Sequence, residues 1–460
     1  MGRLAGQFID SLRMPGRALL IGATSLAGLI VFFVSMKQRS VDPADVSWMY
    51  YVNFVLVYAF QVGPILVYGV FALRKAPPFP PHPPKVRFLC VVPAYNEERV
   101  IQNSVGSLLA QDYPKELYEV YVVSDGSEDR TEEIAQALGA KVLRTGAEGF
   151  GKHRALGYAF QRLLTDDETY VCVFDADNSV GSNYLQAMNN AICERGYRCL
   201  QCFHDVLNGA ANWITKSLWV NCVASSRLYN PGRFQSWGTA LICGTGWCCQ
   251  AGLLRQYWPL IRTQTEDIEL TGLLLLHEGL GVPWVPETHI YDEKPLTLWV
   301  AIRQRHRWMT GHMRVAAVLG WPLLREAVRR RDVRLLEMVG YFLLPFVMNL
   351  GNLQMMLIVG VYLGVFTIHG PLGAPTMKWL LSELTLVYLF GYQVLGFAWE
   401  TGLWVRGAVF SLYAAIFSFV AWTPALLWAC FTVFRQDWIF HTPHVTGIQP
   451  GISSSEAGGE

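Results

Sequence analysis

The sequence has few charged residues and almost no net charge. Aspartate, glutamate, lysine and arginine make up only 16% of its 460 residues, and the formal net charge is +1. A chain so close to neutrality lacks the basic patch with which proteins bind phosphate backbones, so we expect no nucleic acid partner. The shortage of charge accompanies an apolar fraction of 52%, which exceeds the range usual for soluble domains.

Two kinds of motif are also missing. No glycine-rich GxGxxG or P-loop follows the first expected strand, which argues against an NAD-binding or ATP-binding loop there. The ten cysteines are scattered, and Cys199 and Cys202 form one CxxC without a second pair. A zinc site at this pair, with His204 nearby, is therefore the weaker interpretation, and buried, reduced thiols facing a cytosolic compartment are the better one.

Long apolar runs are what the chain has in excess. Five blocks with at most one charge inside them approach or reach the ~20 residues that cross a hydrocarbon core. A buried core helix is the alternative for any single block, but five are difficult to bury otherwise, so we predict an integral membrane protein. The blocks are residues 18–35, 48–73, 338–366, 379–399 and 407–434.

Basic residues predict the orientation of these spans. Three arginines precede the first block, and Arg74 and Lys75 close the second, which favours a cytoplasmic N-terminus and a two-span hairpin. The polar KQRS segment after the first block argues against a cleaved signal peptide. We expect a multi-pass protein of the cell (inner) membrane with a cytoplasmic central domain. The side of the C-terminus stays open, because 407–434 could re-enter around Pro424 or a span could be miscounted.

Between the second and third blocks the pattern changes to alternating strands and helices. Apolar, β-branched runs of strand length alternate with helical segments, which predicts a parallel, Rossmann-like sheet. Segments rich in Arg, Trp and Leu follow at 296–320 and 321–340, and predict amphipathic helices in the membrane interface. The expected parts are a membrane hairpin (1–76), a proline-rich linker (77–84), an α/β domain (85–295), interfacial helices (296–337), C-terminal spans (338–440) and a tail (441–460).

The stretch YVCVFDADN, residues 170–178, ends an apolar run with two carboxylates. Asp175 and Asp177 are one residue apart on an extended chain, so they share one face. The carboxyl end of a central strand is where α/β sheets usually bind ligands. Hard oxygen ligands there suit Mg²⁺ or Mn²⁺ holding a diphosphate. A solvated strand end with a turn at Asn178 is the alternative for this motif taken alone.

Four further sites are each weak alone. Asp125 ends a strand in SDGS, and Lys152 opens a helix, where a lysine could meet a phosphate. The triplet Thr265-Glu266-Asp267 precedes an apolar helix, and residues 304–308 read QRHRW. Taken singly, these sites are a turn acid, a surface cation, acids at a helix N-terminus and an interfacial basic patch.

Taken in order, the series PAYNE, SDGS, GK, DAD, TED and QRHRW resembles the membrane-embedded family 2 glycosyltransferases, the group containing cellulose, chitin, hyaluronan and poly-N-acetylglucosamine synthases. The resemblance covers residues 88–308 and the arrangement of spans on both sides. It implies an α/β GT-A (Rossmann-like) cytosolic domain inserted between transmembrane α-helices, and a UDP-sugar as the donor.

The resemblance also implies a role for each matching residue. Asp267 of the TED triplet would be the catalytic base. Asp175 and Asp177 would form the DxD motif for Mg²⁺ or Mn²⁺, with Asp177 preferred as the direct ligand. Residues around the nucleotide-sugar would be Tyr95, Glu97 and Asp125 near the uridine, Lys152 and Asp175 near the phosphates, and Gln304, Arg307 and Trp308 closing over the diphosphate. The acceptor side would be lined by Cys243, Gly244, Thr245, Glu266 and Trp308.

One departure from the family is visible. The family commonly has a small-residue run ending in ALN after its lysine, whereas this chain has HRALG, so Gly157 stands where an asparagine is usual. Aromatic and polar residues elsewhere leave alternatives. Trp237 and Trp247 could stack on sugars or pack in the core. The amides at 349, 352 and 354 favour interhelical hydrogen bonds over a glycan-lined channel.

The implied enzyme is an inverting hexosyl- or N-acetylhexosaminyltransferase that forms a β-glycosidic bond on a growing polysaccharide or other membrane-associated acceptor. One alternative is a non-processive enzyme that makes a glycolipid by a single transfer to a lipid. A non-enzymatic membrane transporter or scaffold is the alternative from another class. The sequence does not indicate the sugar, the linkage or whether an accessory subunit takes part.

Overall fold

The computed structural model describes residues 47–57, 63–74, 77–146, 151–367 and 391–433. They divide into two compact units. The sheet unit comprises the described residues within Leu66–Gln304 and Tyr392–Phe417, and the helical unit those within Met1–Ile65, Arg305–Gly391 and Ser418–Trp438. The expected span at 18–35, most of the one at 379–399, and the tail lie outside the described residues.

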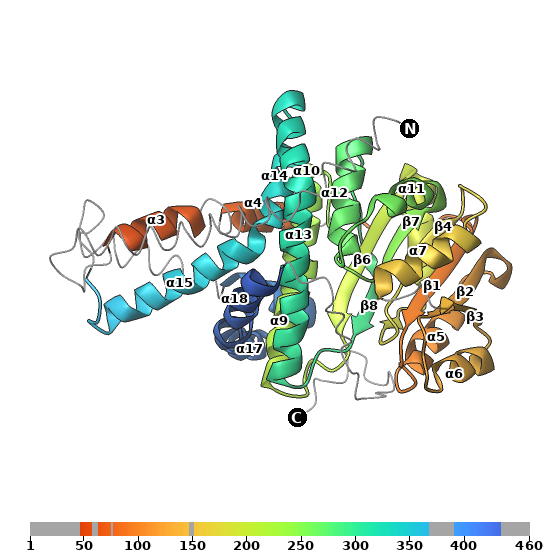
Figure 1. Ribbon diagram of the computed structural model, residues 1–460, viewed down its shortest axis with the longest axis horizontal. Coiled ribbons are helices and arrows are strands. Elements are labelled where there is room, and N and C mark those ends of the chain that lie inside the picture. The colour runs from red at the N-terminus through yellow and green to blue at the C-terminus, as the bar shows by residue number, and fades with distance from the viewer. Residues whose placement is uncertain (1–46, 58–62, 75–76, 147–150, 368–390, 434–460) are drawn as a thin grey trace. The chain divides into compact units, whose positions relative to one another are not determined.

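The sheet unit is built on an eight-stranded sheet with the order β3-β2-β1-β4-β7-β6-β8-β5 (Figure 1). The first four strands in this order are parallel, as the alternating pattern predicts. Their bounds are β1 Phe88–Ala94, β2 Tyr118–Ser124, β3 Lys141–Arg144 and β4 Tyr170–Val173.

The other half of the sheet is mixed, so the prediction of a parallel sheet is wrong there. β7 pairs antiparallel with both β4 and β6, β8 pairs parallel with β6, and β5 pairs antiparallel with β8. Strands and helices still alternate after residue 178, but β5 and β6 come before β7 in the chain, and it is β7 that lies beside β4. The bounds are β5 Ser179–Val180, β6 Cys199–Val206, β7 Trp247–Gln250 and β8 Trp284–Asp292.

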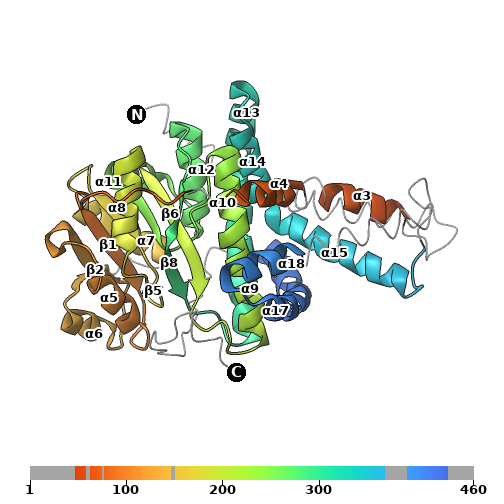
Figure 2. The same cartoon turned by 180° about the vertical axis from the view of Figure 1, so that it is seen from behind.

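Alternate side chains of each strand point to opposite faces of the sheet, and helices cover the apolar side chains there. Cys90 and Val92 of β1 share a buried cluster with residues of α5 (Ile101–Leu109), α6 (Thr131–Leu138) and α8 (Tyr184–Arg195). Figure 2 shows these three helices from behind. In α7 the apolar stripe, from Ala155 to Phe160, is buried. The helices that carry site residues or their supports are α7 (Lys152–Leu163), α11 (Ala251–Tyr257) and α12 (Glu266–Glu278).

Two helical segments far apart in the chain pack together in the sheet unit. The helix at residues 391–401 lies against α9 (Trp213–Ala224), where Gln393 Nε2 donates to Asn221 Oδ1 at 2.7 Å. α17 (Trp404–Phe417) packs there too, and Phe397 and Phe410 share a buried cluster with β6 and α9. The described end of the expected span at 379–399 therefore makes polar contacts with the domain that carries the sheet.

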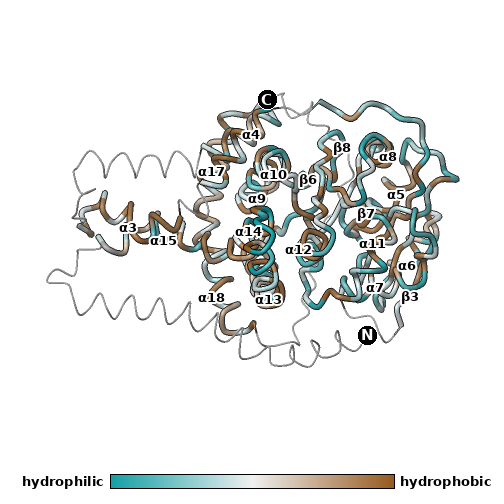
Figure 3. The backbone as a smooth tube through the Cα atoms, turned by 90° about the horizontal axis from the view of Figure 1, so that it is seen from above, coloured by the Kyte–Doolittle hydropathy of each residue, from teal (hydrophilic) through white to brown (hydrophobic). Residues whose placement is uncertain are grey.

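The helical unit contains α3 (Ser47–Val57), α14 (Val333–Phe342), α15 (Leu344–Tyr362) and α18 (Thr423–Thr432). Figure 3 shows that α3 and α15 are largely hydrophobic. Asn53 Nδ2 of α3 donates to Gln354 Oε1 of α15 at 3.0 Å, and Asn352 Nδ2 donates to Thr423 Oγ1 at 2.9 Å. These contacts confirm interhelical hydrogen bonding for Asn352 and Gln354, whereas Asn349 Nδ2 donates to the Pro345 carbonyl of its own helix at 2.9 Å.

The segment after the sheet forms two helices, as expected, but the boundary between them lies at residues 331–332. α13 runs from Leu298 to Arg330 with Pro322 inside it, so the expected boundary between residues 320 and 321 is wrong. A proline removes one backbone donor from a helix, which makes Gly320-Trp321-Pro322 resemble a break in the sequence, but the helix continues through it.

Two helices among the described residues are long and apolar enough to cross a membrane by length and composition, Leu344–Tyr362 and Trp404–Thr432. Gly63–Ala72 (α4) is a shorter apolar helix. Side chains on one side of α17 are exposed, including Val405 at 80% and Ile416 at 53%. These observations fit membrane insertion, and the number of spans stays a prediction.

Candidate active site

One side of the site is formed by the residues that directly follow β1 and β2. Backbone pairing brings them together, since the Asp125 N–H donates to the Ala94 carbonyl at 2.9 Å. Tyr95 follows β1 with 43% of its surface exposed, whereas Glu97 is buried, and its N–H donates to Thr131 Oγ1 at 2.8 Å. The structure thus places these predicted uridine-side residues at the carboxyl end of the parallel strands.

Asp125 links the nucleotide side to the helix that carries Lys152. Its Oδ1 accepts from the hydroxyl of Thr145, which follows β3, at 3.1 Å. Its Oδ2 accepts from the N–H of Gly151 at 2.7 Å, directly before α7. A carboxylate at a helix N-terminus satisfies an unpaired backbone donor and matches the helix dipole. Asp125 therefore fixes the start of α7.

Lys152 is the centre of the charged cluster. Its ammonium donates to Asp175 Oδ1 and to the Gly244 carbonyl, both at 2.6 Å, and lies 3.6 Å from Glu266 Oε1. Burial alone would lower the pKa of Lys152, but the nearby carboxylates of Asp175, Glu266 and Asp267 outweigh it and raise the pKa. The lysine is therefore held as a cation between the DxD strand and the TED helix.

Glu266 and Asp267 begin α12 and face this lysine and the acceptor-side segment. Burial raises the pKa of Glu266, Lys152 lowers it and Asp267 raises it, and together they bring this pKa to about 7. A Cβ placed on Gly244 would lie 3.5 Å from Asp267 Oδ2. Burial and then Asp267 raise the pKa of the Cys243 thiol to about 12, so this thiol stays protonated. Asp267 thus lies beside the Cys243–Gly244 backbone.

The acceptor-side segment is hydrogen-bonded into the DAD turn. The Asp175 N–H donates to Thr245 Oγ1 at 3.0 Å and to Asn178 Oδ1 at 3.1 Å, and the Thr245 hydroxyl also bonds Asn178. Gln201 on β6 supports the same segment, because its Oε1 accepts from the Cys243 N–H at 2.9 Å. Sequence reasoning missed the part played by Asn178 and Gln201; only the position of Asn178 directly after DAD pointed to it.

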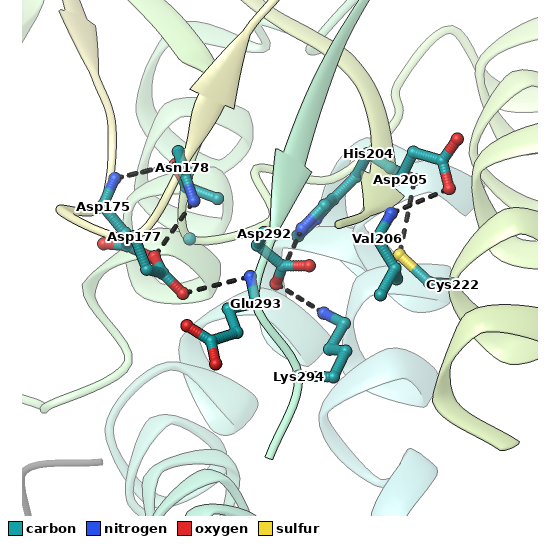
Figure 4. Close-up of polar contacts among 12 residues, drawn as sticks. Asp175, Asp177, Asn178, His204, Asp205, Val206, Cys222, Asp292, Glu293 and Lys294 are labelled. Atoms are coloured by element: carbon teal, nitrogen blue, oxygen red, sulfur yellow. Dashed lines mark hydrogen bonds and ion pairs between the residues drawn. The ribbon is translucent and has the colours of Figure 1, made fainter. Parts of the chain in front are cut away.

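Asp177 faces the end of β8, as Figure 4 shows. Its Oδ1 accepts from Asn178 Nδ2 at 3.1 Å, and its Oδ2 accepts from the Glu293 N–H at 3.3 Å. The residues flanking this peptide are pinned, since Asp292 forms ion pairs with Lys294 and, at 3.0 Å, with His204. Sequence reasoning missed this group as well.

Asp292 is ionised despite its burial. Burial would raise its pKa, but Lys294 and His204 lower it to about 2. The Lys294 N–H donates to Asn208 Oδ1 at 2.9 Å, and Asn208 Nδ2 donates to the Lys294 carbonyl at 2.8 Å. The main chain that orients Asp177 is therefore fixed on both sides of Glu293.

The two carboxylates of the DxD motif fit a divalent cation. They provide hard oxygen donors, and the ligands of Mg²⁺ usually include one or two carboxylates together with substrate phosphates and water. No group of three or more metal-ligating side chains occurs within the described ranges, so phosphates and water would have to complete the coordination. Asp175 Oδ1 is paired with the cation Lys152, whereas Asp177 accepts from the neutral N–H groups of Asn178 and Glu293, so Asp177 keeps more negative charge for the ion; its choice as the direct ligand stays a prediction.

The remaining predicted residues have other surroundings. Trp247 is fully buried and stacks on Trp258, with ring centroids 6.3 Å apart, so it packs in the core. Gln304 belongs to the sheet unit, whereas Arg307 and Trp308 belong to the helical unit. There Trp308 packs near Trp422, with centroids 6.2 Å apart. The roles expected for these three QRHRW residues stay predictions.

A mixed sheet whose parallel half brings Asp125, Lys152, a DxD motif and an acidic helix together has the GT-A fold of nucleotide-sugar-dependent glycosyltransferases. The solved structure of a mannosyltransferase from Pyrobaculum calidifontis, in complex with GDP-Man and Mn²⁺, supports this fold. It superposes with a TM-score of 0.52 at 17% identity, covering 85% of this chain and 100% of that one.

A family model matches one region of the chain. Residues 89–258 match the family model described as Glycosyl transferase family 2, so the chain carries a family 2 glycosyltransferase domain. This match weighs against the transporter or scaffold interpretation.

Two curated relatives are similar to about half of the chain. The probable glycosyltransferase YdaM of Bacillus subtilis is 29% identical over 246 residues, 50% of this chain and 56% of that protein. The beta-monoglucosyldiacylglycerol synthase of Synechocystis sp. is 30% identical over 234 residues, 48% of this chain and 47% of that protein. The chain thus spans about half the length of the curated relatives it matches.

Proposed function

We propose that this protein is an inverting glycosyltransferase that moves a hexosyl or N-acetylhexosaminyl group from a UDP-sugar to a membrane-associated acceptor. The observation that carries the proposal is the convergence on Lys152 of Asp175 from the DxD motif and Glu266 from the TED helix, with Asp267 directly beside Gly244. A lysine cation close to carboxylates, one of which can act as a base, suits a displacement at a sugar carbon.

In the proposed reaction, Asp267 accepts the proton of the acceptor hydroxyl while that oxygen attacks the anomeric carbon. The bond from this carbon to the diphosphate oxygen breaks, and UDP leaves with the bonding electrons. Attack opposite the leaving group turns an α-linked donor into a β-linked product. The Lys152 ammonium, already held next to Asp175, stabilises the negative charge that grows on the diphosphate.

A divalent cation, Mg²⁺ or Mn²⁺, would be held by Asp177 with support from Asp175. When bound it would neutralise charge on the leaving diphosphate. We place the catalytic domain on the cytoplasmic side of the cell membrane, where UDP-sugars are available. The long apolar helices Leu344–Tyr362 and Trp404–Thr432 support a membrane location.

The acceptor is either a growing polysaccharide or a lipid. We retain the polysaccharide as the first candidate because the series of motifs resembles that of the polymer synthases. A single transfer to a lipid is the second candidate, and the similarity to a beta-monoglucosyldiacylglycerol synthase favours it. Radiolabelled UDP-sugar distinguishes them: only a short product that extracts into organic solvent supports a single transfer to a lipid.

The test of the proposed function is a donor screen with the purified full chain in detergent. UDP release is measured with each UDP-sugar in the presence of Mn²⁺ or Mg²⁺, with lipid and oligosaccharide acceptors. We expect turnover with one donor, and a loss of about 10²–10⁴-fold in kcat for Asp267→Asn, the usual contribution of a general base. No release from any donor, or near-normal turnover by Asp267→Asn, would contradict the proposal.

A further inference from the structure

The indole of Trp258 connects the lysine helix with the chain that leads to the TED helix. Trp258 is buried, with 7% of its surface exposed, and its Nε1–H donates to the carbonyl of His153 at 3.1 Å. It stacks on Trp247 and meets Phe160 of α7 edge-on, with centroids 4.7 Å apart. The ring is therefore held by β7 on one side and by α7 on the other.

Gly157 makes room for this ring. A Cβ at this position would lie 3.1 Å from Trp258 Nε1 and 3.2 Å from Cδ1, tighter than ordinary packing allows. The glycine lies one turn after His153, on the same side of α7. A glycine inside a helix costs roughly 0.5–1 kcal/mol relative to alanine. Here the missing side chain lets the indole reach the His153 carbonyl, which gives the departure from the family's asparagine a physical reason.

The other end of the same segment is attached to α12. After Trp258 the chain turns at η5 (Trp258–Leu260), and the Thr263 N–H and hydroxyl donate to Glu269 Oε2 at 2.8 and 2.7 Å. Glu269 is one turn beyond Glu266, near the start of the same helix. Residues 258–263 therefore contact the first turn of α7 at one end and the first turns of α12 at the other.

We propose that Trp258 is a positioning residue for donor binding: its hydrogen bond to His153 holds the first turn of α7 so that Lys152 points at the diphosphate. The inference rests on the proposed function. Lys152 directly precedes His153, and its ammonium has three partners at 2.6–3.6 Å, so a small shift of the turn breaks this geometry. Asp125 fixes the turn from the Gly151 side, and Trp258 fixes it from the His153 side.

The experiment measures UDP binding by calorimetry and donor KM and kcat for the full chain in detergent. Trp258→Phe keeps an aromatic ring and removes the indole N–H. Gly157→Ala leaves Trp258 itself unchanged and displaces its ring. Loss of one neutral hydrogen bond is worth about 1 kcal/mol, so we expect UDP binding about fivefold weaker in each variant, with donor KM raised by a similar factor. Trp219→Phe is the control, because that indole donates to Asp205 instead, at 2.9 Å.

A double-mutant cycle distinguishes an effect on the position of Lys152 from a general loss of structure around the site. In a Lys152→Met background, Trp258→Phe should not weaken UDP binding further, because the group it positions is gone. Unchanged UDP affinity in both Trp258→Phe and Gly157→Ala, or an equal loss with and without Lys152, overturns the inference. If the wild-type chain binds no UDP at all, the proposed function fails instead. If Trp258→Phe does not fold, the same double-mutant cycle is measured with Gly157→Ala in its place, and that result tests the inference.

Discussion

Glu266 is a buried carboxyl whose neighbours shift its pKa in opposite directions. Burial raises the pKa, Lys152 lowers it and Asp267 raises it, and the outcome is a pKa of about 7 in place of the ordinary 4.5. We therefore expect Asp267→Asn to lower the pKa of Glu266, because a neighbouring negative charge disappears. Lys152→Met should raise it, because the only cation within 4 Å of this carboxylate among the described residues disappears.

The size of the second effect follows from the geometry. The Lys152 ammonium lies 3.6 Å from Glu266 Oε1, and unit charges at that distance attract by about 4–5 kcal/mol at an effective dielectric constant of about 20. A change of one pKa unit is about 1.4 kcal/mol, so this attraction limits the rise to roughly three units, and solvent entering the variant will reduce it. We expect Glu266 to stay protonated to above about pH 8 in Lys152→Met.

The same pKa has a consequence for stability. Because the folded pKa of Glu266 exceeds the unfolded value, the native state binds the proton more tightly between pH 4.5 and about 7. Stability from this group is therefore fully present below pH 4.5 and is lost as pH rises through 7, by about 3 kcal/mol in total. Glu266→Gln should not show this part of the pH dependence.

Infrared difference spectroscopy with pH steps measures the titration directly. The band of the protonated carboxyl is assigned by its loss in Glu266→Gln, and its midpoint is then compared among wild type, Asp267→Asn and Lys152→Met. Glu269→Gln is the control, since Glu269 is another buried carboxyl of α12 but is bonded to Thr263. The reasoning is refuted by a wild-type midpoint near 4.5, or by midpoints that move in the same direction in the two neighbour variants.

Two further predictions concern the metal and the packing. Asp177→Asn should raise the Mn²⁺ concentration for half-maximal UDP release at least ~10-fold. The increase should be larger than that of Asp175→Asn, because Asp175 is already paired with Lys152. Equal increases in the two variants would contradict the assignment of Asp177 as the metal ligand. Gly232→Ala should destabilise the chain by about 1–3 kcal/mol or more, because a Cβ there would lie 2.0 Å from the Tyr68 carbonyl oxygen. Gly320→Ala is the control and should not destabilise the chain, because a Cβ at Gly320 would meet nothing within 4 Å. Thermal unfolding in detergent compares the two variants.

The first half of the fold could be predicted from the sequence because its signals are local. Each strand up to β4 is a short apolar run followed by polar turn residues, and the helices between them carry a clear apolar stripe. In a parallel sheet the carboxyl ends of neighbouring strands share one edge. That geometry explains why the sequence alone places Asp125 and Asp175, 50 positions apart, near one another.

The second half could not be predicted in the same way. Trp247–Gln250 is four residues long, and neither its composition nor its length indicates that it runs antiparallel to β4. The contacts of Gln201 with the Cys243 backbone and of His204 with Asp292 join distant segments, and hydrogen-bonding residues of this kind have no periodic pattern. Pro322 misleads for the opposite reason, because it is a strong local signal that the surrounding helix overrides.

The bond between Thr245 and the DAD turn limits how this enzyme can be re-engineered. The loop that faces the acceptor also closes the backbone of the metal-binding turn, since Thr245 bonds the Asp175 N–H and the Gly246 N–H donates to Val173 at 2.8 Å. Inserting or deleting a residue between Ile242 and Gly246 would therefore displace Asp175 and the Lys152 ammonium bound to it. A library meant to broaden the range of acceptors should keep this loop at constant length and vary only the side chains around it.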